Sequence, residues 1–254
     1  MKNPLFFLLG LLLLLSACDE TEELAIDYKY DYFPLEIGKY ITYSVDSITY
    51  STLNGNIVID TGSYQIRETV VDTFTIIDTF NNTITIGPLV YEVERKRRKN
   101  AGDAWQIETV LAVHRGANRL EWTENNRKFI KMFFPLKSEK KWNGNLYFDE
   151  TELVPVKGEV IEVFKAWESN VTAIDEPYSY ANFDFDSTMV ISQANSENVI
   201  EYRYSTERYA RGIGLIEKEM KILDTQCITP CANDTWEQKA EKGFIFRMTM
   251  IDHN

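Results

Sequence analysis

An alternation of apolar and polar residues with a period of two runs through the chain from Tyr28 onward. Ile41, Tyr43 and Val45, for example, are separated by single polar residues. A period of two places successive side chains on opposite faces of an extended chain, which predicts β-strands that each bury one face. The same pattern, rich in Tyr, Thr, Ile, Val and Phe, recurs in segments 89–94, 105–113, 188–192, 199–209, 215–223 and 244–251.

Turn-forming residues separate these segments, at Asn54-Gly55-Asn56, Asn81-Asn82, 100–103, Asn143-Gly144-Asn145 and Lys157-Gly158. Asn, Asp and Gly readily adopt the backbone conformations that tight turns require. The spacing predicts about ten to twelve antiparallel strands, with one short helix over 159–169. We therefore expect an all-β, antiparallel fold: a large curved sheet or half-barrel, possibly two related β halves. A sheet of this kind buries one face and leaves the other solvated, and its concave face would be apolar.

A short internal similarity supports the two halves. Phe33-Pro34-Leu35 precedes Gly38-Lys39-Tyr40, and Phe134-Pro135-Leu136 precedes Lys140-Lys141-Trp142. This predicts halves 30–132 and 133–254 within a single β-rich domain over 30–254. Coincidence in a β-rich chain is the competing explanation, because two short matches do not establish a repeat.

The N-terminus carries an export signal. An apolar run from Leu5 to Leu15 is too short for a membrane-spanning helix and suits the core of a signal peptide. It ends in Leu15-Ser16-Ala17-Cys18, which resembles the lipobox of bacterial lipoproteins. The resemblance implies that residues 1–17 are a lipoprotein signal peptide, that cleavage precedes Cys18, and that Cys18 is acylated and anchors the chain to a membrane. The alternative is an ordinary signal peptide followed by a chance cysteine.

Four of the five residues after Cys18 are acidic, so residues 18–29 are expected to form a solvated acidic tether. An acidic cluster directly after a lipidated cysteine is similar to the surface-export signal of Bacteroidota lipoproteins. The expected location is therefore the outer membrane, lipid-anchored, on either its periplasmic or its cell-surface face.

Charge and composition exclude several partners. A formal net charge of −12 argues against nucleic-acid binding. Two His and three Cys cannot build a His-rich metal site or a four-cysteine zinc cluster. The basic run Arg95–Lys99 is expected to be a solvated hairpin end. A contact with anionic envelope polymer or lipid headgroups is its alternative role.

Cys227 and Cys231 lie four positions apart across Pro230. In an exported protein this spacing predicts a structural disulfide. A redox-active pair is less compatible, because such pairs have two intervening residues at the start of a helix.

The catalytic motifs are weak. Asp184-Phe185-Asp186-Ser187-Thr188 matches the D-x-D-x-T string of haloacid-dehalogenase-type phosphatases, but no alternating β-α pattern follows it. It is expected instead to be a strand with Phe183 and Phe185 inward and both Asp outward. His114 is expected near a strand end and His253 in a frayed C-terminus, and no G-x-S-x-G motif accompanies them. We expect no catalytic residue, no cofactor and no metal site.

Several longer motifs resemble uncharacterised envelope lipoproteins of Bacteroidota. They are Tyr32-Phe33-Pro34-Leu35, Phe134-Pro135-Leu136 with Trp142-Asn143-Gly144-Asn145, Asp175-Glu176-Pro177-Tyr178, and the octapeptide YARGIGLI at 209–216. The resemblance implies a fold but no assigned activity. The leading hypothesis is a non-enzymatic binding or assembly module for lipid, glycan or protein. The alternatives are a carboxylate-dependent hydrolase acting on envelope polymer and a purely structural spacer.

These hypotheses predict different interiors. A binding module needs an apolar cavity or patch. A hydrolase needs two acids facing each other across a groove, one with a raised pKa. A spacer needs neither.

Overall fold

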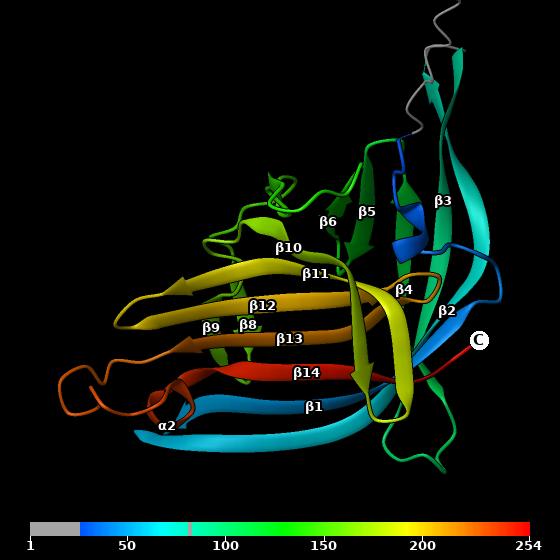
Figure 1. The fold of residues 1–254 in the computed structure, drawn as a ribbon. Coiled ribbons are helices and arrows are strands. Elements are labelled where there is room, and N and C mark those ends of the chain that lie inside the picture. Colours follow the sequence, from blue (N-terminus) through cyan, green and yellow to red (C-terminus); the bar gives the residue numbers. More distant parts are fainter. Residues whose placement is uncertain (1–25, 81–82) are drawn as a thin grey trace, which may run out of the picture.

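The computed structural model describes residues 26–80 and 83–254 (Figure 1). Within these ranges the chain forms a twelve-stranded antiparallel sheet and a separate two-stranded sheet. Helical structure there is limited to the 3-10 turn η2 (Tyr30–Tyr32) and the short helix α2 (Trp236–Lys239). The expected all-β antiparallel fold is therefore confirmed. Cys18, the signal peptide 1–17, most of the tether 18–29 and the predicted turn Asn81-Asn82 lie outside the described residues.

The strands of the large sheet follow one another in space from one edge to the other. Their order is β6 (Arg127–Phe133), β5 (Arg119–Glu124), β4 (Gln106–Arg115), β3 (Thr83–Arg98), β2 (Asn56–Phe80), β1 (Tyr40–Leu53), β14 (Lys242–His253), β13 (Gly214–Asp224), β12 (Glu201–Ala210), β11 (Phe183–Glu197), β10 (Ser169–Tyr180) and β7 (Lys141–Trp142). The small sheet pairs β8 (Leu153–Val156) with β9 (Glu159–Glu162).

This order consists of two runs of consecutive hairpins joined in the middle. Strands β1 to β6 lead to one edge, and β14 back to β10 leads toward the other. The first and last strands pair at the junction, from Ile41 opposite His253 to Tyr50 opposite Gly243. The division into related halves 30–132 and 133–254 remains a prediction.

The hairpin between β1 and β2 shows how the sequence makes such a turn. Asn54 and Gly55 connect the two strands and both have positive φ angles, 52° and 77°. Two consecutive left-handed residues form the turn whose twist matches the flanking strands, and Asn-Gly is its preferred sequence.

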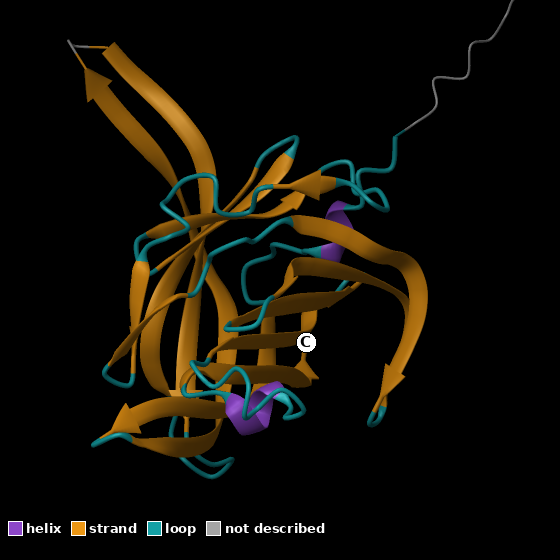
Figure 2. Cartoon of the chain, turned by 90° about the vertical axis from the view of Figure 1, so that its left-hand side faces the viewer, coloured by secondary structure: helices purple, strands orange, loops and turns teal. Residues whose placement is uncertain are grey.

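The sheet curls on itself, as Figure 2 shows, and hydrogen bonds join its two edge strands. At the seam, the main-chain N–H of Ile130 in β6 donates to the carbonyl of Gly144, 2.8 Å away, just beyond β7. The indole Nε1–H of Trp142 donates to the carbonyl of Ile130 at 2.9 Å. The result is a nearly closed, barrel-like sheet that encloses an interior.

The connection between β7 and β10 differs from the sequence prediction. A helix was expected over 159–169, but Glu159–Glu162 forms β9, turns follow it, and β10 begins at Ser169. The helix prediction was wrong because tertiary packing outweighs a weak helical pattern. Ile161, Val163 and Trp167 are buried against Ala194 and Ile222 of the large sheet, and β9 pairs with β8.

The C-terminus was expected to be frayed, and this expectation was also wrong. His253 ends β14, lies opposite Ile41 in β1 and packs its ring against Phe183, with 6.2 Å between ring centroids. Pairing along nearly the whole of β14 holds the last residues in the sheet.

Candidate functional site

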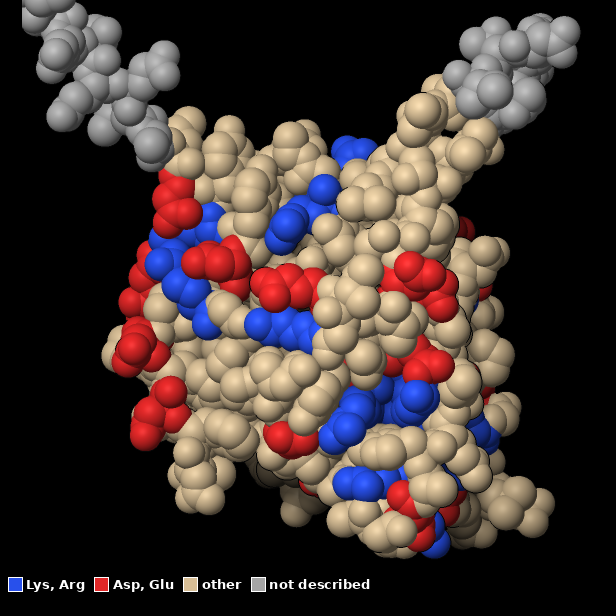
Figure 3. Space-filling model, turned by 90° about the vertical axis from the view of Figure 1, so that its right-hand side faces the viewer, with Lys and Arg blue, Asp and Glu red and all other residues tan. Residues whose placement is uncertain are grey.

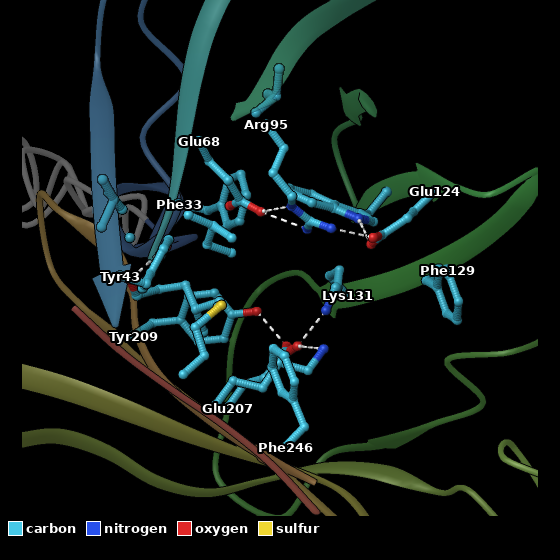
Figure 4. Close-up of a pocket in the computed structure, with 18 of the residues that line it drawn as sticks. Phe33, Tyr43, Glu68, Arg95, Glu124, Phe129, Lys131, Glu207, Tyr209 and Phe246 are labelled. Atoms are coloured by element: carbon cyan, nitrogen blue, oxygen red, sulfur yellow. Dashed lines mark hydrogen bonds and ion pairs between the residues drawn. The ribbon is translucent and has the colours of Figure 1, made fainter. Parts of the chain in front are cut away.

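A cavity of about 410 Å³ lies inside the curl of the sheet (Figure 4). Its lining comes from both runs of hairpins and from segment 154–167, where Val154 of β8 and Val163, Phe164 and Trp167 contribute. Pockets that bind small molecules have volumes of roughly 300–1,000 Å³. The fold therefore brings distant parts of the chain around a space large enough for a small ligand.

Aromatic and aliphatic side chains form much of the cavity wall. Phe129 of β6 packs against Phe164, with ring centroids 5.5 Å apart, and Phe164 packs against Trp167 at 5.4 Å. Phe246 and Met248 of β14 contribute from another part of the curl. These last two are two positions apart, so the strand alternation turns both to the same face.

Two clusters of charged side chains interrupt the apolar lining. In the first, the Arg95 guanidinium in β3 binds the carboxylates of Glu68 in β2 and Glu124 in β5. Glu68 Oε1 accepts from Arg95 Nε at 2.9 Å and from Nη2 at 2.6 Å, and Glu124 Oε1 accepts from Nη1. The indole N–H of Trp122 donates to the second oxygen of Glu124 at 3.1 Å. Burial would raise the pKa of Glu124, but Arg95 outweighs it and the pKa is lowered.

The second cluster is centred on Glu207 of β12, whose side chain is 0% exposed. Its Oε1 accepts a hydrogen bond from Lys131 Nζ of β6 and forms an ion pair with Lys218 Nζ of β13, 3.0 Å away. Its Oε2 accepts from the hydroxyl of Tyr209 at 2.6 Å. Burial would raise the pKa of Glu207, but the two lysines and Tyr209 outweigh it and hold that pKa well below its usual range. Burial also lowers the pKa of Lys131 and raises that of Tyr209, so the tyrosine stays a donor.

The two clusters carry opposite excess charge. Arg95 faces two carboxylates, which gives its cluster a formal charge of −1. Lys131 and Lys218 share the single carboxylate of Glu207, which gives the second cluster a formal charge of +1. Figure 4 shows both clusters beside the same space. The cavity thus combines apolar walls with two charged clusters of opposite sign.

Sequence reasoning missed these residues. It expected an apolar concave face and a solvated basic run, whereas Arg95 points into the cavity with only 16% of its side chain exposed. A signal was present: Arg95 lies two positions after Val93, which is buried, so both belong to the same strand face. Neither periodicity nor composition shows that Glu68 and Glu124 lie across from it.

The residues that the sequence did single out lie elsewhere. Asp184 and Asp186 are exposed on β11 and Phe185 between them is buried, as expected for a strand. His114 lies one residue before the end of β4, with Nδ1 2.8 Å from the carbonyl of Leu89. Cys227 and Cys231 follow β13 with their sulfurs at disulfide distance and their Cα atoms 5.6 Å apart.

Two further observations concern metal-binding groups and membrane-spanning helices among the described residues. Across 26–80 and 83–254, no group of three or more His, Cys, Asp or Glu is placed to hold a metal ion. Over the same ranges, no helix has both the length and the apolar character needed to cross a bilayer.

Comparison with known proteins adds little. No protein-family model matches the chain, and no curated protein matches it. A crystal structure from Parabacteroides distasonis, described as a "putative lipoprotein", is 11% identical to the chain with a TM-score of 0.31. The alignment covers 88% of this chain and 98% of that protein. Similarity at this level establishes neither a shared family nor a shared function.

Proposed function

We propose that the protein is a non-enzymatic binding module of the cell envelope, anchored to the outer membrane through acylated Cys18, that holds an amphiphilic small molecule inside its curled sheet. The observation that carries the proposal is the cavity of about 410 Å³, which combines aromatic walls with a charged centre. Of the three partner classes considered from the sequence, a lipid-like molecule fits such an interior best.

The apolar part of the ligand is assigned to the aromatic wall. Phe129, Phe164 and Phe246 present ring surface to the cavity, and removing apolar ligand surface from water contributes roughly 25 cal/mol per Å² before the costs of binding. A glycan would instead need many hydrogen-bonding groups spread over the wall.

The polar head of the ligand is assigned to the lysine pair. Lys131 and Lys218 share one carboxylate, so an added anion would complete the neutralisation of this cluster. Lys218 has 20% of its side chain exposed and can turn toward a ligand, while Lys131 keeps Glu207 paired. The head group is therefore expected to be a carboxylate, a phosphate or a similar anion.

The charges also favour binding over hydrolysis. Carboxylate-dependent glycoside hydrolysis uses one acid with a raised pKa that stays protonated. Glu124 and Glu207, which line the cavity, instead have lowered pKa values because cations bind them. Ion-paired carboxylates of this kind are poor proton donors near neutral pH.

The experiment measures binding of the fluorescent anion anilinonaphthalene sulfonate to the purified mature protein. We expect saturable binding, with palmitate displacing the dye at lower concentration than hexadecanol, which has the same chain but no charge. Lys218→Met should weaken dye binding by about tenfold, the cost of one charged hydrogen bond. Absence of saturable binding, or equal displacement by the acid and the alcohol, would overturn the proposal.

A second pair of variants locates the bound dye. Met220 of β13 lines the cavity, and Met220→Trp should fill it and abolish dye binding. Glu219, its neighbour in the strand, lies on the opposite face and pairs with Arg247, so Glu219→Trp is the matched control. Equal loss in both variants would show that the dye binds outside the cavity.

A further inference from the structure

Strands β2 and β3 extend past the rest of the sheet as an isolated arm, which we define as residues 71–77 and 85–89. The last pair between β1 and β2 is Tyr40 with Thr69, and the first between β3 and β4 is Tyr91 with Val113. Beyond these positions the two strands pair only with each other, from Phe74 opposite Val90 outward. Figures 1 and 2 show the arm projecting from the body of the molecule.

The arm is apolar on its surface. Its exposed large side chains are Val71 at 37%, Phe74 at 43%, Ile76 at 50%, Ile77 at 66%, Ile86 at 75% and Leu89 at 47%. Within residues 71–77 and 85–89 the charged residue is Asp72, at the base of the arm, and Asp78 follows farther along β2. An isolated two-stranded hairpin is at best marginally stable in water, and a concentrated apolar surface of this kind marks an interaction site.

The N-terminus and the arm lie at the same end of the molecule. The described chain begins at Ile26, and the arm projects from that end in both views (Figures 1 and 2). In Figure 3 the part of the arm drawn in tan, below the grey atoms, shows no Lys, Arg, Asp or Glu on the face in view, whereas such residues are visible on the body below it. A membrane that holds the N-terminus would therefore face the arm.

The lengths of tether and arm are compatible. Eight residue steps separate Cys18 from Ile26, so the extended tether reaches at most roughly 28 Å. Strand β2 continues from Thr73 to Phe80, a distance of roughly 23 Å at the usual strand rise. A bilayer anchored at Cys18 is thus held within reach of the arm.

We propose that the arm inserts its apolar side chains into the surface of the membrane to which the protein is anchored, as a second attachment that orients the domain. The open edges of the arm carry unpaired backbone N–H and C=O groups, which cannot enter the hydrocarbon core unsatisfied. The arm therefore lies at headgroup depth, where its isoleucine and phenylalanine side chains reach the outer part of the acyl region. This inference rests on the proposed anchoring and not on the cavity ligand.

The first test places spin labels on cysteines introduced by Phe74→Cys or Ile86→Cys in the acylated protein, bound to vesicles of phosphatidylethanolamine and phosphatidylglycerol. Leu53→Cys is the matched control, because Leu53 is also an exposed apolar residue, 63% accessible, beside the β1–β2 turn far from the arm. We expect collisions with oxygen to exceed collisions with a water-soluble nickel chelate at the arm positions only. Equal aqueous exposure at all three positions would overturn the proposal, and would point to a protein partner for the arm.

The second test removes the anchor, so that failure of the anchoring proposal is seen separately. Mature protein carrying Cys18→Ala should still float with the same vesicles, and Ile86→Asp should weaken this partitioning by about tenfold. Leu53→Asp should leave it unchanged. Flotation that is absent without the acyl chains, or insensitive to Ile86→Asp, would contradict a membrane role for the arm.

Discussion

The indole of Trp142 donates a hydrogen bond to the main-chain carbonyl of Ile130 at 2.9 Å and thereby joins the two edge strands of the large sheet. The Ile130 amide in turn donates to the carbonyl of Gly144. These bonds close the curl around the cavity, so the shape of the interior depends on contacts at a seam formed by residues more than ten positions apart.

Trp142→Phe is expected to loosen this seam. Losing the indole hydrogen bond should lower the free energy of unfolding by about 1–3 kcal/mol, because the Ile130 carbonyl is left buried without that donor. Urea unfolding measures the change, and the Ile130 amide should exchange with deuterium faster. Trp236→Phe is the control, since its indole binds Glu197 away from the seam. Unchanged exchange at Ile130 would contradict this role of Trp142.

Glu207 should make stability depend on pH. Its folded-state pKa lies below its unfolded value, so its contribution is fully present above the unfolded pKa of about 4.5 and is lost as pH falls toward the folded pKa. The free energy of unfolding should therefore decrease below about pH 5. Urea titrations should show a shallower decrease for Glu207→Gln over that range.

Glu207→Gln should also be destabilising at neutral pH, by about 3–5 kcal/mol, because Lys131 then remains buried without its counter-charge. Glu219→Gln is the matched control in the neighbouring strand, and its half-exposed pair with Arg247 should be worth less than ~1 kcal/mol. Equal costs for the two variants would show that the Glu207 cluster does not stabilise the interior.

Cys18 is expected to carry acyl chains. A clickable palmitate analogue supplied to growing cells should label the wild-type protein and not Cys18→Ala. Equal labelling of the two proteins would indicate that residues 1–17 act as an ordinary signal peptide.

The pair Cys227 and Cys231 is expected to be oxidised in the exported protein. Peptide mass mapping without reductant should find the two residues in one peptide, lighter by two hydrogens than the dithiol. The closed loop is short, so reduction should cost only ~2 kcal/mol. Two alkylatable thiols in the native protein would refute the disulfide.

His114 is expected to be dispensable. Its ring makes a hydrogen bond with the Leu89 carbonyl near the end of β4 and does not line the cavity. His114→Ala should change stability by less than ~1 kcal/mol and leave dye binding unaltered. Loss of function with unchanged stability would instead reveal a His-dependent activity.

The sequence by itself determined the elements and many of their turns. The alternation of Tyr43 and Val45 with polar residues predicts β1, and Asn54-Gly55 predicts the hairpin that follows it. These features are local, because the period of two and the left-handed backbone of a turn depend only on neighbouring residues. The all-β antiparallel fold follows from their sum.

Tertiary structure alone decided which charges meet inside the sheet. Arg95 and Glu68 are 27 positions apart, and Lys131 and Glu207 are 76 positions apart. Strand periodicity groups residues onto a face, but it does not state which face the curl encloses or which strands close the seam. Both depend on the register of every strand pair and on the contact of Trp142 with β6. Only the fully curled sheet buries these charged side chains away from water and brings them within contact distance of one another.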